Sequence, residues 1–491
     1  MSKHSFASGL LRRAASLVSA PAAFRPGTTL PGLHAPFASA PATGTVGARA
    51  LPAKALRRSL RLSAIEGMAA EVVTAFAGGA VLTGWALYLG LSPLGVGLLS
   101  ALPFLSQALQ IPSAYLSEAL GNRKVCIVAV AASRQALLPL VALPFLPLSQ
   151  GGKQAVLLTV AGAAALLGVV GNHAWVSWMG ALVPRRIRGR YFGRRTALCT
   201  LAGTVASLIA GLVLDGAGRT GQTAWALAGL ALFACAAGVV TTLLMVRQHA
   251  PESKSCPRLT IAAALAPLRD PGARALLAYQ LAWNGAIGIS GAYFALHMLE
   301  NLKMGFTLIA LHGASVAVVR ILMGPVWGRM LDRVGARPVL IFCSCGISII
   351  PLYWLWATEG FLWPIALDVV VSAGLWSGHA LAVFQLPLAV APRESRSFYL
   401  ASFAMAGGVA YAVSTFVGGT LAQLLPARFF VLGQPAVSLH VLFALSSLLR
   451  AVASLLALRI TEPGARSVEE LTRVLGAEVF SGRIAALLVR R

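Results

Sequence analysis

The sequence contains few charged residues, and acidic ones are especially rare. Only 11% of its 491 residues are Asp, Glu, Lys or Arg, and just 15 are acidic. A soluble domain carries about 25% charged residues, so this scarcity argues against a soluble enzyme. Apolar residues make up 57% of the chain and the mean hydropathy is +0.78, which also excludes a disordered chain. These values are typical of a protein embedded in a lipid bilayer.

The sequence also lacks the motifs of catalysis and of metal or nucleotide binding. It shows no phosphate-binding glycine loop, no nucleophile triad and no zinc spacing of its cysteines. We therefore expect no enzyme activity, no cofactor and no metal site. The net charge of +25 does not indicate nucleic acid, because the basic residues fall between apolar runs instead of on a soluble surface.

Apolar runs long enough to cross a bilayer recur along the chain. A spanning helix needs about 20 mostly apolar residues. We place twelve spans at residues 65–89, 93–118, 125–147, 154–181, 195–217, 223–246, 276–298, 306–328, 338–357, 361–390, 398–424 and 437–459. The predicted fold class is therefore an all-α membrane protein with twelve transmembrane helices.

The basic residues indicate the orientation. Of the 40 Lys+Arg, 33 fall on the side of the chain termini, four on the other side, and Arg134, Arg320 and Arg450 within spans. Positive charge is retained in the cytoplasm during insertion. We therefore expect both termini in the cytoplasm and the protein in the cell inner (plasma) membrane.

The segment before the first span allows more than one interpretation. Residues 1–64 contain no Asp or Glu and are rich in Ala, Ser, Arg and Pro, as organellar transit peptides are. A disordered basic tail or a start site placed too far upstream gives the same composition, and we prefer these simpler interpretations. An organellar envelope is the alternative location.

The domain organisation follows from the spans. We divide the chain into a basic tail (1–64), a first six-helix half (65–246), a cytoplasmic linker (247–275), a second six-helix half (276–459) and a cytoplasmic tail (460–491). Helical spacing of Val468, Leu471, Val474 and Leu475 predicts an amphipathic helix in the last segment, lying on the inner leaflet. A short helix of the same kind is predicted over residues 260–268.

Two polar signatures recur at corresponding loops of the two halves. Residues 116–124 follow the second span and align with 330–337 after the eighth, which pairs Glu118 with Asp332. Residues 181–191 follow the fourth span and align with 389–399 after the tenth, which pairs Arg188 with Arg396. Parallel repeats of six spans are an arrangement found in secondary transporters.

The segment from Gly328 to Arg337 resembles the loop signature of the major facilitator superfamily. The first copy departs from it, with Ala114 at the leading glycine and Glu118 at the aspartate. Residues 279–284, 327–332 and 391–396 resemble a poorly characterised bacterial sugar-transport-like subgroup. The resemblance covers residues 60–460. It implies two pseudo-symmetric six-helix halves that work by alternating access, and it does not identify a substrate.

Polar stripes inside the spans supply the candidate substrate-cavity residues. In the resembled fold, spans 1, 4, 7 and 10 line the central cavity. The candidates on these spans are Glu71, Trp85, Asn172, His173, Gln280, Asn284, Asp368, Trp376 and His379. Amide, imidazole and indole groups suit a neutral polyhydroxyl or amphiphilic solute. The same groups also join helices through hydrogen bonds in lipid, so both roles stay open.

Intramembrane charges need partners, because an unpaired charge is costly in a bilayer. Glu71 and Arg134 lie at similar depths and form one candidate pair; Asp368 could pair with Arg320. A carboxylate that alternates between an arginine and a proton would couple transport to protons. A static structural pair is the alternative for each.

The loop acids are candidates for gating. In the resembled superfamily such an acid lies near the start of a helix in the other half, where the helix dipole favours it. We therefore predict that Asp332 lies near Arg188 and Glu118 near Arg396, and that these contacts close the cytoplasmic side.

Together these patterns predict a monomeric secondary active transporter of a small neutral polar or amphiphilic solute. A coupling proton and the lipid bilayer are its other expected partners, and nucleic acid is not expected. The alternative is a transport-inactive protein of the same fold that acts as a receptor or assembly partner. Substrate identity, direction and coupling ion are not readable from the sequence.

Overall fold

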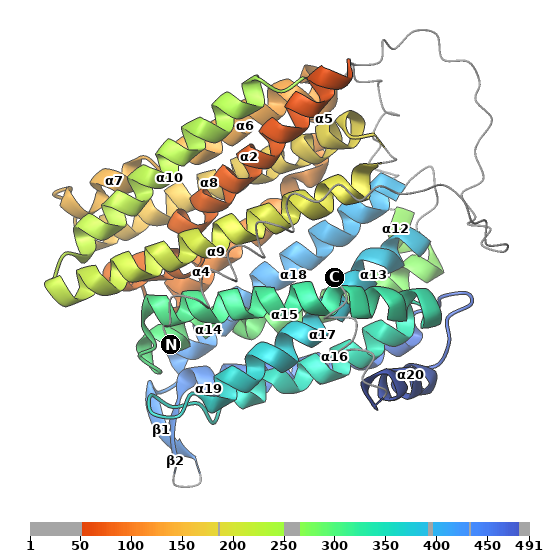
Figure 1. Cartoon of the computed structure of the whole chain (residues 1–491). Coiled ribbons are helices and arrows are strands. Elements are labelled where there is room, and N and C mark those ends of the chain that lie inside the picture. Colours follow the sequence, from red (N-terminus) through yellow and green to blue (C-terminus); the bar gives the residue numbers. More distant parts are fainter. Residues whose placement is uncertain (1–51, 185–186, 250–265, 391–395, 432–433, 481–491) are drawn as a thin grey trace, which may run out of the picture. The chain divides into compact units, whose positions relative to one another are not determined.

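The computed structural model describes residues 52–184, 187–249, 266–390, 396–431 and 434–480, all within one compact unit, Leu51–Arg491. Almost every element is a helix (Figure 1). The first half contains α2 (Ala53–Ala77), α3 (Gly79–Tyr88), α4 (Pro93–Leu105), η1 (Ser106–Leu109), α5 (Gln110–Leu120), α6 (Asn122–Gln135), α7 (Pro139–Ala142), η2 (Leu143–Phe145), α8 (Gln150–Leu182), α9 (Arg188–Thr220) and α10 (Thr223–Val246).

The second half repeats this arrangement. It contains α12 (Ala266–Arg269), α13 (Pro271–Gly291), α14 (Tyr293–Glu300), α15 (Gly305–Val334), α16 (Ala336–Tyr353), α17 (Trp363–Val390), α18 (Arg396–Leu424), α19 (Ser438–Leu456), η4 (Ala457–Arg459) and α20 (Val468–Phe480). An antiparallel hairpin of β1 (Arg428–Val431) and β2 (Gln434–Val437) joins α18 to α19. The predicted short helix at 260–268 lies mostly outside the described residues.

Ten helices of the described part are long and apolar enough to cross a membrane. Two interrupted segments complete the twelve spans. One runs from α4 through η1 to α5 and contains Pro103, whose ring removes a backbone donor inside the helix. The other runs from α13 to α14 and breaks at Ala292. The twelve-helix fold class is confirmed.

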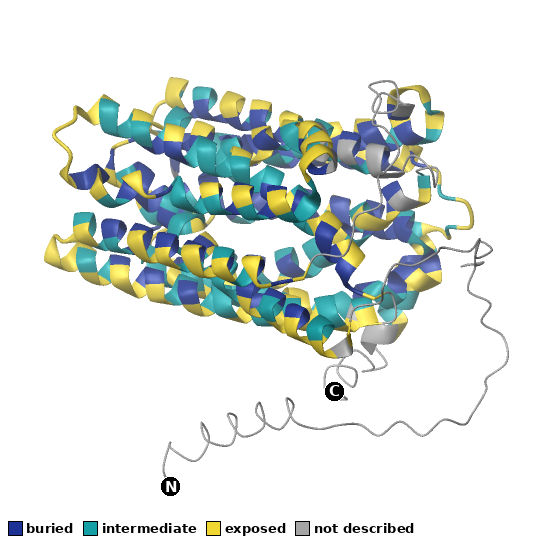
Figure 2. Cartoon of the chain, turned by 90° about the horizontal axis from the view of Figure 1, so that it is seen from above, coloured by how far each residue is buried: buried dark blue, intermediate teal, exposed yellow. Residues whose placement is uncertain are grey.

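The outward faces of the spans are apolar. Large exposed side chains include Leu201, Phe233, Val318, Phe384 and Leu448, one on each of five different helices. Figure 2 shows that exposed residues alternate with buried ones along the outer helices. A surface of this kind is stable in lipid, where the helix satisfies its own backbone hydrogen bonds. The chain is therefore a multi-pass membrane protein.

The first helix begins before the start predicted from hydropathy. α2 starts at Ala53, so the expected tail ends earlier than residue 64. Ser63 is completely buried, and the Tyr191 hydroxyl donates a hydrogen bond to the Leu60 carbonyl at 3.3 Å. The basic side chains on the other face of this segment, Arg57, Arg58 and Arg61, lower its mean hydropathy and obscure the helix.

A C-terminal helix forms where the apolar spacing predicts one, and its apolar face packs on protein. Leu471 of α20 is completely buried, and α20 contacts α15 and α16. Glu462, just before α20, accepts hydrogen bonds from the backbone N–H groups of Ala336 (3.2 Å) and Arg337 (2.7 Å). These are first-turn donors of α16, where a helix dipole favours a carboxylate.

The Glu462 contact attaches the C-terminal tail to the segment that carries the loop signature, and a substitution can test it. Glu462→Gln should remove the charge and weaken the attachment of α20 by about 1–2 kcal/mol. Hydrogen–deuterium exchange of residues 468–480 should then be faster than in the unmodified protein. Glu470→Gln, which removes an exposed ion pair with Arg466 within the tail, is the matched control and should leave that exchange nearly unchanged.

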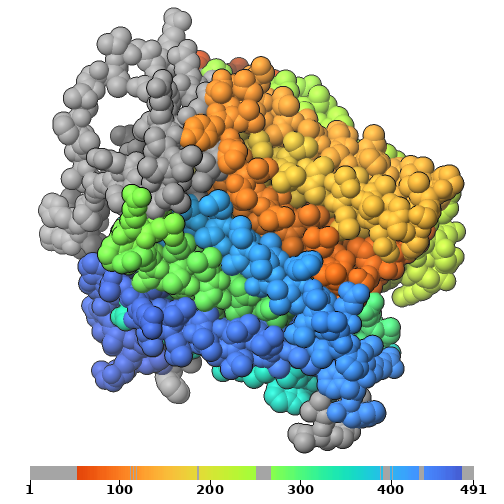
Figure 3. Space-filling view, turned by 180° about the vertical axis from the view of Figure 1, so that it is seen from behind, coloured from red at the N-terminus to blue at the C-terminus, as the bar shows by residue number. Residues whose placement is uncertain are grey.

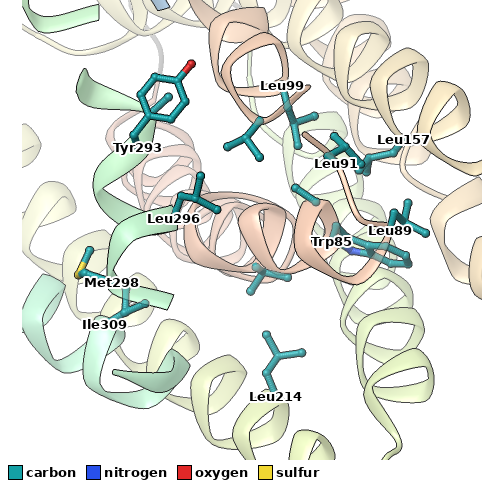
Figure 4. Packing of buried hydrophobic residues seen from close by; sticks show 14 of the residues in the cluster. Trp85, Leu89, Leu91, Leu99, Leu157, Leu214, Tyr293, Leu296, Met298 and Ile309 are labelled. Carbon is teal, nitrogen blue, oxygen red and sulfur yellow. The ribbon is translucent and has the colours of Figure 1, made fainter. Parts of the chain in front are cut away.

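The buried apolar side chains form one shared cluster at one end of the bundle and two separate clusters at the other. We call the end where α2 begins and α19 ends the terminal end, and the opposite end the distal end. At the distal end a single cluster combines both halves, including Trp85 and Leu214 of the first with Tyr293 and Ile309 of the second (Figure 4). At the terminal end each half has its own cluster, around Cys126 and Met179 in one case and around the α15–α16 region in the other.

In the described residues, two helix pairs make the most extensive contacts between the halves. α4 packs against α18, and α9 packs against α15. Figure 3 shows the first seam, where orange residues of α4 adjoin blue residues of α18. Phe104 stacks on Tyr411 with ring centroids 3.7 Å apart, and a Cβ on Gly408 would lie 2.6 Å from the Phe104 carbonyl oxygen. The halves are therefore tightly closed along this part of the seam.

Candidate functional site

A cavity of about 420 Å³ lies between α2–α3 and α9 of the first half and α15 of the second. We call it the central cavity. Hydroxyl groups of Thr74, Thr200, Thr204 and Ser207 line it, and apolar side chains such as Phe306 complete its wall. Glu71 is the one ionisable residue among its lining residues in the described part of the chain. The volume falls within the range of small-molecule sites.

A second, smaller cavity of about 230 Å³ lies inside the first half, beside Glu71. Its walls carry two acidic and two basic side chains, namely Glu66, Glu71, Arg134 and Arg195. We call these four residues the charge quartet. They come from α2, α6 and α9, so the tertiary fold brings together charges that lie far apart in the sequence.

Within the quartet, one ion pair is well formed. Arg195 approaches Glu66 at 3.2 Å, and their side chains are 17% and 4% exposed. The guanidinium also lies 4.4 Å from the centroid of the Trp175 ring, which stabilises a cation by its quadrupole. A third contact runs from Arg195 Nε to the Ser63 carbonyl at 3.2 Å. The sequence alone does not identify this pair, because its two residues lie 129 positions apart.

Glu71 and Arg134, which the sequence predicted to pair, both line this smaller cavity. They form no direct ion pair in the described part of the chain. Arg134 interacts electrostatically with both Glu66 and Glu71, while its buried Nε has no hydrogen-bond partner among the described residues. Glu71 lines both cavities. It is therefore the member of the charge quartet that also lines the central cavity.

In the second half, Asp368 is paired differently from the prediction. Its Oδ2 lies 3.5 Å from Nε2 of His312, a residue of α15. Arg320, the predicted partner, is exposed on α15 and forms no ion pair with Asp368 in the described residues. His312 and Arg320 are eight residues apart, about 12 Å along the helix, so only one of them can reach Asp368.

His379 joins helices within the second half. Its Nε2 lies 2.8 Å from the Tyr279 hydroxyl, which lies 2.7 Å from the Ser344 hydroxyl. Its ring stacks on Trp283 at 4.8 Å, and Trp376 packs against it edge-on at 5.2 Å. The arrangement favours the helix-joining role that the sequence left open.

The remaining cavity candidates are spread over several environments. Asn172 lines the smaller cavity, and His173 is the next residue of α8. Trp85 is buried in the distal core. Gln280 is buried, and its carbonyl accepts a hydrogen bond of 2.8 Å from Asn284 Nδ2. None of these residues lines the central cavity in the described part of the chain.

The predicted gating residues lie at the terminal end, where the halves have separate cores. Arg188 donates hydrogen bonds to the carbonyls of Gly180 (2.6 Å) and Val183 (3.2 Å), and Asp332 is exposed. No ion pair joins Asp332 to Arg188 in the described residues. The side chains of Glu118 and Arg396 lie outside the described part. These contacts stay predictions for a state in which the terminal end is closed.

At the distal end an acid near the end of the fifth predicted span bridges the halves. Asp215 of α9 accepts hydrogen bonds from the backbone N–H groups of Phe306 (2.8 Å) and Thr307 (2.9 Å) at the start of α15. Gly305 has φ +74°, and a Cβ there would lie 3.2 Å from both carboxylate oxygens. The helix N-terminus therefore binds an anion supplied by the other half. We call this contact the distal latch.

The bundle is that of a multi-pass membrane protein with a polar cavity between its two halves. No family model matches the chain. The tetracycline resistance protein, class E, of Escherichia coli is 28% identical over 111 residues, covering 23% of this chain and 27% of that protein. The match thus spans about a quarter of that curated relative.

Solved structures match most of the chain. A variant of the nucleoside transporter NupG gives a TM-score of 0.64 at 11% identity, over 82% of this chain and 100% of that one. The xylose transporter XylE from E. coli, in a partially occluded inward-open conformation, gives 0.59 at 11%, over 84% and 98%. The fucose:proton symporter FucP from E. coli gives 0.55 at 13%, over 83% and 100%. The chain has the fold of major facilitator superfamily transporters, as its loop signature predicted.

Proposed function

We propose that the protein is a secondary transporter that moves a small solute through the central cavity by alternating access. One observation carries the proposal. The halves share a core and a latch at the distal end, whereas at the terminal end each half packs separately in the described residues. This is the arrangement of a transporter that is closed at one end only. Rocking of the two halves would open the distal end and close the terminal end.

The lining favours a neutral polar or amphiphilic solute. Four hydroxyl side chains provide donors and acceptors, while Phe306 and Ile309 provide apolar surface. The charge of Glu71 is offset electrostatically by Arg134 and Arg195. The sugar and nucleoside transporters of the same fold carry solutes of this general kind. A proton gradient, as in the fucose:proton symporter, is the driving force that we propose.

Two substitutions test the role of the lining. Thr204→Val and Ser207→Ala should each remove one hydrogen bond to the solute, worth about 1 kcal/mol, and raise KM about fivefold. Thermal stability should be nearly unchanged, because neither change alters volume much. Thr242→Val, which removes a hydroxyl bonded within α10, is the control and should leave KM unchanged. Unaltered KM in both cavity variants would contradict this solute position.

We also propose that the protein lies in the inner membrane with its terminal end in the cytoplasm, because most Lys and Arg residues fall on that side. A cysteine at Arg190, exposed at the start of α9, should resist an impermeant thiol reagent applied to whole cells. A cysteine at Arg219, exposed at the other end of α9, should react. Reaction in the opposite pattern would reverse the assigned orientation.

Transport itself is tested in two steps. Purified protein is first screened for thermal stabilisation by sugars, nucleosides, polyols and neutral amphiphiles. Each stabilising solute is then tested for counterflow in proteoliposomes, where labelled solute should accumulate transiently against unlabelled solute inside. Stabilisation without counterflow by any of these solutes would instead favour the alternative of a transport-inactive receptor or assembly partner.

A further inference from the structure

A third cavity, of about 660 Å³, lies at the terminal end of the first half, where α2 and α6 begin and α10 ends. α10 packs against both of the other helices (Figure 1). Four basic side chains line this cavity, namely Lys54, Arg58, Arg123 and Arg247. No acidic residue lines it in the described part of the chain. The cavity therefore attracts anions, and we call it the basic pocket.

The basic pocket contains polar atoms that are buried without a partner. Gln248 lines it and is 2% exposed, yet neither the amide nitrogen nor the amide oxygen forms a hydrogen bond with any described residue. Nε of Arg123 is also buried and unpaired among the described residues. Burial of polar groups without hydrogen bonds costs free energy, so these atoms indicate a ligand that bonds to them.

The second half has a matching arrangement at its own terminal end. There Arg337 Nη2 donates a hydrogen bond to the Leu458 carbonyl at 3.0 Å. At the aligned position of the first half, Arg123 Nη2 donates to the Val246 carbonyl at 2.6 Å. Each arginine thus joins the start of one helix to the end of the last span in its half. In the second half the chain itself adds an anion, because the Glu462 carboxylate accepts the backbone N–H of Arg337 at 2.7 Å.

The first half provides no such carboxylate in its described residues. After Val246 the chain continues with Arg247, Gln248 and His249, which add basic and neutral groups to the pocket. An anion from outside the chain would therefore complete in the first half what Glu462 completes in the second.

An apolar surface extends from the basic pocket along the outside of α10. Val246 lines the pocket and is exposed. Leu243 and Val239, three and seven residues earlier, are also exposed and lie on the same face of the helix. The end of a spanning helix lies at the level of the lipid headgroups. Acyl chains can cover this apolar face while a headgroup enters the pocket, whereas a soluble anion would leave the face uncovered.

We propose that the basic pocket binds the headgroup of an anionic phospholipid from the leaflet at the terminal end. The phosphate oxygens accept hydrogen bonds from Arg58, Arg247 and the amide nitrogen of Gln248. A headgroup hydroxyl, such as those of phosphatidylglycerol, donates to the amide oxygen of Gln248. The bound lipid joins the start of α2 to the end of α10. This site lies apart from the central cavity, and the inference does not depend on transport.

Binding of short-chain lipids to the purified full chain in neutral detergent tests this inference. The probes are dioctanoyl-phosphatidylglycerol, dioctanoyl-phosphatidylcholine, glycerol 3-phosphate and inorganic phosphate, and the measured quantity is the Kd of each. Phosphatidylglycerol should bind at least about tenfold more tightly than phosphatidylcholine, because several basic side chains attract its net charge. The two soluble phosphates should also bind at least about tenfold more weakly, because they bury no apolar surface.

Substitutions locate the bound lipid. Arg58→Gln and Arg247→Gln should each weaken phosphatidylglycerol binding about fivefold, and neither should unfold the protein, because both side chains are exposed. Gln248→Met should weaken it about tenfold without lowering the midpoint of thermal unfolding measured without lipid. Arg57→Gln is the matched control, since Arg57 is exposed beside Arg58 but does not line the basic pocket. It should change the Kd less than about twofold.

Three results would overturn the inference. Equal Kd values for the two lipids would show that the basic side chains do not select an anionic headgroup. Binding of inorganic phosphate as tight as that of phosphatidylglycerol would assign the pocket to a soluble anion. Equal effects of Arg57→Gln and Arg58→Gln would show that only the overall charge of α2 matters. None of these results bears on the proposed function, because solute counterflow is measured separately.

Discussion

Replacement of Asp215 by alanine is expected to open the distal end of the protein. The substitution removes two hydrogen bonds, of 2.8 and 2.9 Å, between a carboxylate and the first backbone donors of α15. One hydrogen bond to a charged group contributes about 1.5–3 kcal/mol, so loss of both bonds should lower the ratio of closed to open molecules by at least about 10- to 150-fold. Spin labels at Arg219 of α9 and Glu300 of α14, both exposed at the distal end, would measure the shift as a longer distance.

Asp215→Asn is the matched variant for this experiment. The amide keeps one acceptor oxygen but loses the charge that the helix N-terminus favours, so its effect should be intermediate. Because Asp215 lies at the end of α9, neither variant should unfold the bundle. An unchanged distance distribution in Asp215→Ala would show that the apolar contacts of the distal core alone keep this end closed.

Breaking the buried ion pair of the charge quartet should have the largest effect on stability. Glu66→Gln leaves Arg195 without its carboxylate at 3.2 Å, in a site where the acidic side chain is 4% exposed. Removal of one partner from a buried pair costs about 3–5 kcal/mol, because the remaining charge stays desolvated. Thermal unfolding of the purified protein in detergent should show a clearly lower midpoint.

A double variant separates loss of pairing from loss of packing. Glu66→Gln combined with Arg195→Met removes both charges and should recover part of the lost stability, since a neutral pair needs no counterion. Glu469→Gln breaks an exposed pair with Arg473 in α20 and should change the midpoint little. Equal midpoints for Glu66→Gln and Glu469→Gln would contradict the structural importance of the quartet.

Much of the fold could be predicted from the sequence because the bilayer imposes strong rules. Each span needs a long apolar run, and basic residues accumulate on one side, so helix number follows from hydropathy. The repeated loop signatures, with Glu118 opposite Asp332, also revealed the two halves. The start of α2 was missed because Arg57 and Arg58 make its first turns polar, although the opposite face is buried.

Partners within the site were less predictable. Helical spacing shows which residues share a face, but it does not say which neighbouring helix that face meets. Spacing also does not fix how far one helix is shifted along another: Asp368 was paired with Arg320 of α15, and the packing of α15 on α17 presents His312 of the same helix instead. In the same way, Asp215 resembled an ordinary residue at a span end until the start of α15 was placed beside it. Glu71 was recognised because an acid well inside the first span was distinctive in the sequence alone.

The central claim is alternating access, and one experiment tests it directly. Spin-label pairs are placed at both ends of the bundle in lipid nanodiscs, Arg219 with Glu300 at the distal end and Lys124 with Arg459 at the terminal end. As the solute found by the thermal screen is added, one distance should lengthen while the other shortens. Distances that change in the same direction, or that do not change although the solute binds, would contradict the account.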